Sequence, residues 1–583
     1  MNALSVGGKT WISKEFSTDD ITFYKTNFFL DDIVAKLLSI RKIKKEEIKN
    51  FLYPTIKNTL PNPYILKDMD HAVSRTVKAI SNKEKIGIFG DYDVDGATST
   101  AILGKYFELL NIPFEIYIPD RKSEGFGPNE NAFLEFINLG VNLIFTVDCG
   151  TLSFAPINFA KKKNIDVIIL DHHQSETKLP SAHSIVNPNR FDDKSELNYL
   201  CAAGVCFLFL VALNKRLRDQ LFFSKKTIKE PSLISLLDLV SLGTVCDVVP
   251  IIGLNRALVH QGLKILREKK NLGLKTLIDV CNIEKNITTH ELGYVLGPRI
   301  NAGGRVGKST HGANLLLNQN SKDAFKLAAD LNDFNKERQI LENELLNKIL
   351  NVDYKNNAEP VTIIYGENWH EGIIGIIAAR VKEKFNKPAI VISVNKGVGK
   401  GSGRSVYGFD LGSAIIGAVQ SDLLIKGGGH KMAAGFTITM SKIDEFKDFI
   451  FRKFKSININ LEEKKNYYFD TEIAPSAINI DFFEKINLLA PFGSGNPEPR
   501  FIIKNVKVVN SKIVGEKHIK VILVGSDSST IKGISFNSVE SELDSYLLGK
   551  NIKPFNVAGK LSLNEWRGKK NVEFIIDDIS VIK

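Results

Sequence analysis

Apolar runs that alternate with helical patterns occupy the first half of the chain. Lys85–Phe89, Asn142–Val147 and Asp166–Leu170 are nearly continuous in apolar residues, and Ala97–Leu110 has the spacing of a helix. Continuous apolar strands with helices between them are typical of a parallel sheet that is covered on both faces. The pattern therefore predicts an α/β domain, whose ligands are expected beyond the carboxyl ends of the strands.

A long amphipathic pattern follows this domain. Between Ser321 and Leu350 apolar residues recur mostly at three- and four-residue steps, with charged residues between them, which predicts one long helix. A second alternation of apolar runs and helical patterns, from Val361 to Thr439, predicts another α/β domain. We expect the helix to link the two domains and the substrate to bind in a cleft between them.

The last part of the chain has a mainly β pattern. Five runs predict short strands: Phe501–Val509, Ile519–Val524, Thr530–Phe536, Asn556–Leu561 and Asn571–Ile576. Five such strands suit a small OB-like barrel that binds oligonucleotides, or a plain barrel used only for packing. The basic hairpin at residues 565–570 favours the first, because a base can stack on Trp566 while lysine and arginine hold phosphate.

These patterns divide the chain into five parts. They are an N-terminal extension packed on the domain after it (1–84), a catalytic α/β domain (85–320), a linker helix (321–351), a second, substrate-binding α/β domain (352–460) and a C-terminal barrel (466–583). A chain of 583 residues is too long for a single hydrophobic core, so several domains are expected.

Composition and charge narrow the class of protein. The net charge of +11 favours a polyanionic partner such as nucleic acid, although a lysine-rich surface can also serve only solubility. The five cysteines form no C-x-x-C pair, which argues against a disulfide framework and a structural zinc site. No segment reaches the roughly 18 uninterrupted apolar residues of a membrane span, and no export signal is evident. We therefore expect a cytoplasmic protein that does not contact a membrane.

Acidic and histidine side chains cluster where the predicted strands end. Carboxylates crowded this closely repel one another unless divalent metal neutralises them, and hydrolytic sites often use two such ions. Calcium loops and capping turns also use the pattern at 91–96, but the EF-hand pattern requires a distant glutamate after further acids, and Ala97-Thr-Ser-Thr follows here. The set predicts a two-metal hydrolase and comprises Asp91, Asp93, Asp95, Asp148, Asp171, His172, His173 and Asp247.

One further segment carries candidate chemistry. Gly297–Gly307 is predicted to be a glycine-rich loop that presents two arginines, Arg299 and Arg305. Together with Arg121, which follows Asp120, Arg305 is a candidate to complete a pocket for the terminal phosphate of a strand.

Nine segments together resemble the DHH phosphoesterase family, and within it the bacterial exonucleases that degrade single-stranded DNA from 5′ to 3′. The matching segments span nearly the whole chain, and the β-rich tail fits the same family. They are Gly90–Gly96, Asp120–Gly127, Thr146–Gly150, Leu170–His173, Gly243–Val249, Gly297–Gly307, Gly401–Ser405, Gly427–Lys431 and Pro491–Pro497.

The resemblance implies a set of site residues. Two Mn²⁺ or Mg²⁺ ions would be held by Asp93, Asp95, Asp148, His172 and Asp247, with Asp148 bridging both ions. Asp91 would lie beside the ions and His173 near the scissile phosphate, as catalytic residues. In a DHH-associated second domain, a loop at Gly427–His430 would hold phosphates. Substrate contacts are expected from Arg121, Arg299, Arg305, Ser402, Arg404, His430 and Trp566.

The resemblance also implies a function. We expect hydrolysis of single-stranded DNA from its 5′ end, with release of 5′-mononucleotides in DNA repair and recombination, and a helicase and a single-strand-binding protein as partners. Two alternatives are a phosphodiesterase of short oligonucleotides or cyclic dinucleotides, and a non-catalytic single-strand-binding factor. The barrel and long linker argue against the first, because a small substrate needs neither. The full set of metal-type residues argues against the second.

Overall fold

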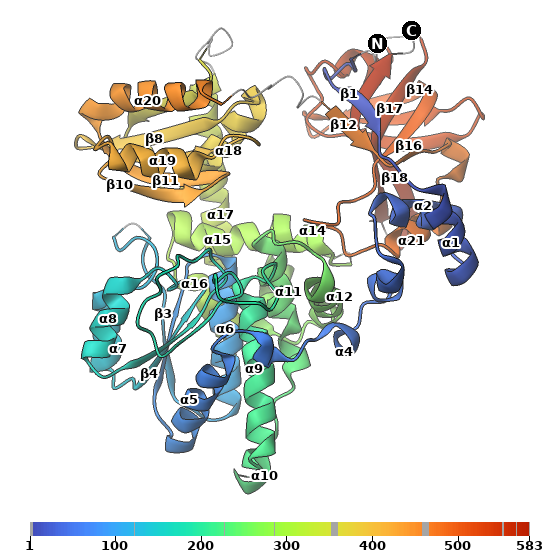
Figure 1. Ribbon diagram of the computed structural model, residues 1–583. Helices are drawn as coiled ribbons and strands as arrows, with labels where there is room; N and C mark the ends of the chain where they lie inside the picture. The colour runs from blue at the N-terminus through green and yellow to red at the C-terminus, as the bar shows by residue number, and fades with distance from the viewer. Residues whose placement is uncertain are drawn as a thin grey trace.

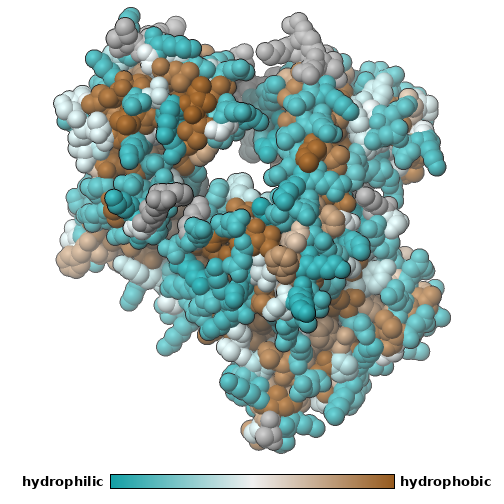
Figure 2. Space-filling model, turned by 180° about the vertical axis from the view of Figure 1, so that it is seen from behind, coloured by the Kyte–Doolittle hydropathy of each residue, from teal (hydrophilic) through white to brown (hydrophobic). Residues whose placement is uncertain are grey.

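Three lobes surround a central opening. The computed structural model describes residues 4–121, 123–226, 228–284, 286–350, 359–457, 466–550, 553–566 and 568–581. In Figure 1 the first α/β domain lies at the bottom, the second at the upper left and the barrel at the upper right. Figure 2, seen from behind, shows an opening between the two upper lobes, above the first domain.

The first domain is built on a five-stranded parallel sheet in the order β3-β2-β4-β5-β6. Its strands are β2 (Ile86–Gly90), β3 (Phe114–Tyr117), β4 (Leu143–Val147), β5 (Asp166–Leu170) and β6 (Ser184–Val186). The parallel sheet and its three predicted strands are confirmed. The chain adds β3 on one side of β2 and then β4 on the other, so the order reverses between β2 and β4. Ligands of such sheets bind at this reversal, beyond the strand ends.

Alternate strand residues face two separate cores. Phe145 and Ile168 pack with helices α5 (Met69–Asn82), α6 (Val94–Leu109) and α9 (Ala202–Asp219) on one face. Ile144 and Ile169 pack with helices on the other face, namely α7 (Glu130–Asn138) and α8 (Phe154–Lys162). Burial on both faces explains why these strands are apolar throughout.

A helical subdomain completes the first domain. It contains α10 (Phe222–Lys226), η3 (Leu233–Leu236), α11 (Leu237–Cys246), α12 (Gly253–Arg267), α13 (Leu272–Val280), α14 (Thr289–Glu291), the π-helical turn η4 (Leu292–Leu296), α15 (Gly297–Val306) and α16 (His311–Leu317). None of the helices in the described ranges is both long and apolar enough to cross a membrane.

The predicted loop at Gly297–Gly307 is wrong, because this segment forms helix α15. Its glycines serve close packing. A Cβ on Gly304 would lie 2.3 Å from the ring of Tyr92, and one on Gly297 would lie 2.5 Å from Cys246 Sγ. Here glycine lets helices approach one another, and neither of these glycines has a positive φ.

The predicted long helix is α17 (Ser321–Leu350), with the same ends. Ala324, Ala328 and Leu331 near its start belong to the core of the first domain. Leu345 and Ile349 near its end belong to the core of the second domain, together with helix α18 (Ile374–Phe385). One helix shared by two cores holds the domains in a defined arrangement.

The second domain has a mixed sheet in the order β10-β11-β9-β8-β7. Only β7 and β8 are parallel. The elements are β7 (Thr362–Glu367), β8 (Ala389–Asn395), β9 (Val398–Arg404), α19 (Leu411–Gln420), β10 (Lys426–His430), β11 (Ala433–Thr439), η6 (Met440–Lys442) and α20 (Ile443–Lys455).

The expected phosphate loop at Gly427–His430 is also wrong, because these residues form the edge strand β10. The strand lies directly against α19. A Cβ on Gly427 would lie 2.7 Å from Ile415 of that helix, and one on Gly412 would lie 2.7 Å from the carbonyl oxygen of Gly429. The glycines therefore permit close packing of strand and helix.

The predicted barrel is confirmed. Its strands close in the order β14-β15-β16-β18-β17, because β17 also pairs with β14. The elements of this lobe are β12 (Asn466–Phe469), β13 (Thr471–Glu472), η8 (Pro475–Ala477), α21 (Ile480–Asn487), β14 (Phe501–Val514), β15 (His518–Val524), β16 (Thr530–Ser535), α22 (Asp544–Leu547), β17 (Phe555–Trp566) and β18 (Lys569–Val581).

The N-terminal segment packs on the barrel at the far end of the chain (Figure 1). Strand β1 (Thr10–Ser13) pairs in parallel with β12, and Trp11 donates a 2.8 Å hydrogen bond to buried Asp578. The next elements, up to α3, pack with the barrel core. The later part contacts the first domain, and so does α3, where the carbonyl oxygen of Phe51 accepts a 2.8 Å hydrogen bond from Arg256 of α12. The expectation that the whole extension packs on the domain after it is therefore wrong for its first part. These elements are α1 (Thr18–Phe28), α2 (Asp32–Ile40), η1 (Lys45–Glu47), α3 (Ile48–Leu52), α4 (Ile56–Thr59) and η2 (Pro63–Ile65).

Candidate metal centre

The acidic side chains lie where β2, β4 and β5 end, at the point where the strand order reverses. After β2 the chain turns into α6, and Asp93 caps this helix by accepting a 3.0 Å hydrogen bond from the amide of Gly96. A Cβ on Gly96 would lie 2.4 Å from the carbonyl oxygen of Asp91, so only glycine fits this turn. The turn holds Asp91, Asp93 and Asp95 close together.

Asp148 follows β4 directly and has a φ of 61°. Its amide donates to the carbonyl oxygen of Leu170 over 3.1 Å, so the backbone remains tied to β5. A positive φ is uncommon for residues other than glycine and concentrates at functional sites. The conformation turns the buried Asp148 side chain toward the cluster instead of along the strand direction.

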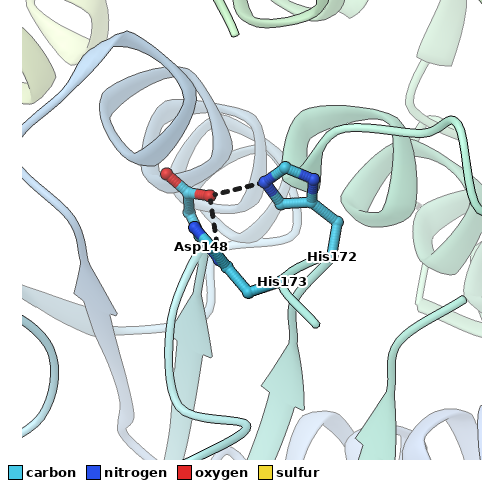
Figure 3. Close-up of side chains that lie close together, drawn as sticks. All are labelled: Asp148, His172 and His173. Carbon is cyan, nitrogen blue, oxygen red and sulfur yellow. Dashed lines mark ion pairs between the residues drawn. The ribbon is translucent and has the colours of Figure 1, made fainter. Parts of the chain in front are cut away.

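His172 lies at the centre of the cluster. Its Nε2 atom is 3.3 Å from Asp148 Oδ1, 3.6 Å from Asp247 Oδ2 and 3.8 Å from Asp95 Oδ2. Figure 3 shows that the carboxylate of Asp148 faces the rings of both His172 and His173. Asp247 comes from the end of α11, outside the sheet, so four chain segments meet here.

The donor atoms fall into three overlapping groups. Within each group the atoms lie within 4.8 Å of one another, and the groups are Asp148-His172-His173, Asp95-His172-Asp247 and Asp91-Asp93-Asp148. Asp148 Oδ1 and His172 Nε2 are both buried and have no hydrogen-bond partner. Buried polar atoms are almost always partnered. Carboxylate and imidazole donors suit Mn²⁺, so a bound cation would supply the missing partner.

Backbone amides orient one of these carboxylates. Asp95 accepts hydrogen bonds of 2.6 Å from the amide of Ala202 and 3.0 Å from the amide of Ala203, at the start of α9. A carboxylate is stabilised at a helix N-terminus. This contact fixes the position of Asp95 independently of any cation.

Asp171 holds the second histidine. It accepts a 2.8 Å hydrogen bond from His173 Nδ1 and others from the amides of His172 and Thr151. Asn187 donates to the carbonyl oxygen of His173 over 2.9 Å. Because Nδ1 is bound to Asp171, the Nε2 atom of His173 remains available for another group.

The pKa values show how strongly the acids repel one another. Burial, and then repulsion from Asp93 and Asp95, raises the pKa of Asp148 well above its ordinary value. Burial and neighbouring carboxylates also raise the pKa of Asp247 to about 8 and that of Asp91 to about 7. Burial alone would lower the pKa of His173, but Asp171 raises it to about 9. A divalent cation would relieve this repulsion.

Three of the predicted arginines meet between the two α/β domains. Arg305 of α15 donates to the carbonyl oxygen of Gly372 in the second domain over 3.3 Å. Burial, followed by repulsion from Arg121, lowers the pKa of both Arg305, to about 10, and Arg404. Arg121 lies 5.3 Å from the ring centre of Tyr92. Among the residues that the structure describes, none of the three has a carboxylate partner. We call Arg121, Arg305 and Arg404 the arginine cluster.

The first turn of α18 adjoins this cluster. A Cβ on Gly375 would lie 3.0 Å from Ser402 Oγ and 3.2 Å from Arg404 Nη2, and Arg404 Nη1 is 3.3 Å from that hydroxyl. Predicted Ser402 therefore belongs with the arginines. Cations that gather without an acid are a site for an anion.

Three other predicted substrate residues have different surroundings. Arg299 donates to Asn332 Oδ1 and to the carbonyl oxygen of Val295, so it joins α15 to α17. His430 is exposed at the edge strand β10. Trp566 ends β17, and its side chain lies outside the part of the molecule that is described, as does Arg567.

Comparisons with known proteins agree with this architecture. Residues 85–244 match the N-terminal domain of the DHH family, residues 358–456 match the DHHA1 domain, and residues 469–578 match the RecJ OB domain. The single-stranded-DNA-specific exonuclease RecJ of Bacillus subtilis is 31% identical over 98% of this chain and 71% of its own length. RecJ of Escherichia coli is 33% identical over 94% of this chain and 96% of its own length. This chain belongs to the RecJ family.

A solved RecJ structure has the same fold. The crystal structure of RecJ from Thermus thermophilus in complex with Mn²⁺ has a TM-score of 0.80 and 26% identity, covering 98% of this chain and 79% of that chain. The crystal structure of the same protein in complex with Mg²⁺ has a TM-score of 0.74 and 25% identity. The match covers 98% of this chain and 78% of that chain. The RecJ match therefore includes all three lobes.

Sequence reasoning missed several residues that position the site in this RecJ-family chain. Asn187 and Asn189 follow β6 and hold the backbone of His173 and His172 through their side-chain amides. Tyr92 lies between the acidic turn, Gly304 of α15 and Arg121. The Asn-Pro-Asn turn at 187–189 was an available signal, whereas the contacts of Tyr92 depend on the tertiary fold.

Proposed function

We propose that this protein is a metal-dependent exonuclease that degrades single-stranded DNA from its 5′ end and releases 5′-mononucleotides. The observation that carries the proposal is a cluster of acids and histidines with unpartnered buried atoms. Beside it lies an arginine cluster whose members form no ion pair with any carboxylate that the structure describes. The first suits divalent cations and the second suits a phosphate. Membership of the RecJ family supports the same chemistry.

The metal ligands would be Asp93, Asp95, Asp148, His172 and Asp247, with Asp148 shared between two Mn²⁺ or Mg²⁺ ions. When bound, such ions lower the pKa of a water molecule and stabilise charge on the phosphate and the departing oxygen. The residues supply the rest. Helix α9 fixes Asp95, and the backbone of Asp148 orients its carboxylate before any substrate arrives.

His173 would contact the scissile phosphate. Asp171 binds its Nδ1 atom, so its Nε2 atom is directed to another partner, and nearly half of the His173 side chain is exposed. Asp91 would lie beside the metal ligands. Its carboxylate would accept a proton, or a hydrogen bond from a water molecule. Displacement at phosphorus by a water molecule requires no nucleophile from the protein.

The arginine cluster would bind the terminal 5′-phosphate. A two-metal centre cleaves any strand that reaches it, so polarity requires recognition of one end. Arg404 and Ser402 come from the second domain, and Arg121 and Arg305 from the first, so the anion would be held where the two domains meet. Arg299, His430 and Trp566 would contribute to substrate binding elsewhere along the strand.

The cellular role follows from this chemistry. We propose action in the cytoplasm on strands that arise in DNA repair and recombination. A helicase would supply such strands, and a single-strand-binding protein would hold them. The barrel is the proposed site for the strand beyond the catalytic domain.

End-labelled single strands test the proposal. With Mn²⁺ or Mg²⁺, a 5′ label should appear first in mononucleotides, while a 3′ label should remain in shortening strands. Duplex DNA with blunt ends should resist. Cleavage of dinucleotides or cyclic dinucleotides alone would favour a small-substrate phosphodiesterase, and release from the 3′ end would refute the assigned polarity.

A further inference from the structure

A wide helical turn presents an exposed tyrosine beside the metal centre. Between α14 and α15 the chain forms the π-helical turn η4 at Leu292–Leu296. Tyr294 in this turn is 76% exposed, and its ring stacks on His290 with centres 5.0 Å apart and planes 29° apart. Turns of this kind are rare and occur frequently at functional sites.

The turn packs on the helix end that carries a proposed metal ligand. The Cys246 thiol donates to the carbonyl oxygen of Leu292 over 3.3 Å, and a Cβ on Gly297 would lie 2.5 Å from Cys246 Sγ. Cys246 ends α11 and directly precedes Asp247. Tyr294 is therefore tied through its own turn to the acidic cluster.

Helix α14, just before this turn, contacts the chain that enters the barrel. Thr289 at the start of α14 donates a 2.7 Å hydrogen bond to the carbonyl oxygen of Phe492. Ile251, four residues after Asp247, donates to the carbonyl oxygen of Ser494 over 2.8 Å. Figure 1 shows α14 near α11 and beside the segment that leads to the barrel. The segment that carries Tyr294 is thus tied both to the helix end at Asp247 and to the chain that enters the barrel.

The residue after Asp247 adds an apolar surface. Val248 has a φ of 60° and is 69% exposed. A β-branched residue with a positive φ is an outlier and concentrates where the surroundings enforce it. The fold therefore holds an apolar side chain in solvent directly beside the acidic cluster, where a flat base could cover it.

We propose that Tyr294, supported by His290, is a stacking platform for a nucleobase on the 3′ side of the scissile phosphate. The inference rests on the proposed function and adds a binding site to it. The arginine cluster holds the 5′ end between the two α/β domains, so the strand leaves the metal centre toward the barrel. Every base has an aromatic face, so the platform accepts any sequence.

Binding measurements with substituted proteins test the platform. Tyr294→Ala should weaken binding of a labelled single strand about 5- to 100-fold, because a lost base–aromatic contact has this effect. Tyr294→Phe should bind within about twofold of wild type, since the ring is kept. The control Phe29→Ala removes an exposed ring, 92% accessible, directly after α1 and should change nothing.

Scanning the strand with one abasic position locates the contact. Wild type should lose affinity when the missing base occupies one position counted from the 5′ end. Tyr294→Ala should be insensitive to that position and keep the sensitivity at all others. A tyrosine that only stabilises its helix through the contact with His290 would instead lower the melting temperature and leave the abasic profile unchanged.

Two outcomes would overturn the platform. These are wild-type affinity in Tyr294→Ala, and a wild-type abasic profile that this substitution does not alter. Equilibrium binding does not depend on cleavage. A protein that binds strands through Tyr294 but releases no mononucleotides would therefore refute the proposed function and leave the platform standing.

Discussion

The acidic cluster and the arginine cluster are neighbours, but they are assembled in different ways. Most of the acids follow consecutive strands of one parallel sheet, and backbone contacts hold Asp95, Asp148 and Asp171 in place. The arginine cluster combines Arg121 and Arg305 with Arg404 from another domain. The acidic cluster is therefore a property of one domain, whereas the proposed end-binding site would exist only while α17 holds two domains together.

The largest effect is expected from a substitution in the acidic cluster. Asp148→Ala should abolish cleavage, because Asp148 is the proposed shared ligand of both ions. The metal-free variant should melt at or above the temperature of wild type, since one member of a repelling buried cluster is gone. Cleavage assays and thermal melts measure both effects. Asp279→Ala, on the exposed side of α13, is the control, and wild-type turnover in Asp148→Ala would contradict the two-metal centre.

A smaller effect is expected from a substitution in the arginine cluster. Arg404→Ala should remove the preference for a 5′-phosphate over a 5′-hydroxyl and cost about 1.5–3 kcal/mol of binding, the range for a charge-assisted hydrogen bond. Competition between the two strands measures the preference. Arg380→Ala, on the same domain but paired with Glu342 and Glu383, should retain it. Equal losses on both strands would mean that Arg404 only follows the backbone.

Protons compete with metal at the acidic side. The pKa values of about 8 for Asp247 and about 7 for Asp91 mean that both carboxyls are partly protonated at neutral pH in the metal-free protein. Ligands must be deprotonated, so Mn²⁺ affinity should rise as pH increases from about 6 to about 9 and level off above that, once Asp247 has lost its proton. Calorimetry in two buffers of different ionisation enthalpy should detect released protons. A constant affinity across this range would contradict the shifted pKa values.

The smallest effect concerns the barrel. Lys569→Ala with Lys570→Ala removes two exposed cations from the start of β18 and should weaken binding of long strands a few-fold. Each lost phosphate contact should reduce the salt dependence by about 0.7 in slope for single strands. Short strands that end before the barrel should bind as before. Equal weakening of short and long strands would show that these lysines act at the catalytic domain.

Hydrophobic patterns predicted the strands and the long helix, because the burial of these elements is visible in their own sequence. Strands β2, β4 and β5 are continuous apolar runs because both sheet faces are covered, and their carboxyl ends necessarily share one edge of the sheet. Placing acids after each run therefore predicted the cluster. The ends of α17 were predicted because its apolar spacing persists over its whole length.

The two glycine-rich loops that we predicted are wrong for the same physical reason. At α15 and β10 the glycines allow close contact with Tyr92, Cys246 and α19, and such contacts are invisible until the partner is known. The packing of the N-terminal segment on the barrel could not be predicted either, because its partners lie more than 400 residues away in sequence. The three arginines were predicted from sequence motifs, but their position between the two domains is known only from the structure.

The pairing of β1 with β12 has a consequence for synthesis on the ribosome. The N-terminal segment is translated before the strands that cover its apolar side chains, which follow more than 400 residues later. Both α/β domains can fold in the meantime, because domains generally fold as units while the chain grows. During this interval the nascent chain carries an exposed apolar helix pair, so chaperones that bind such surfaces should engage it until the final strands leave the exit tunnel.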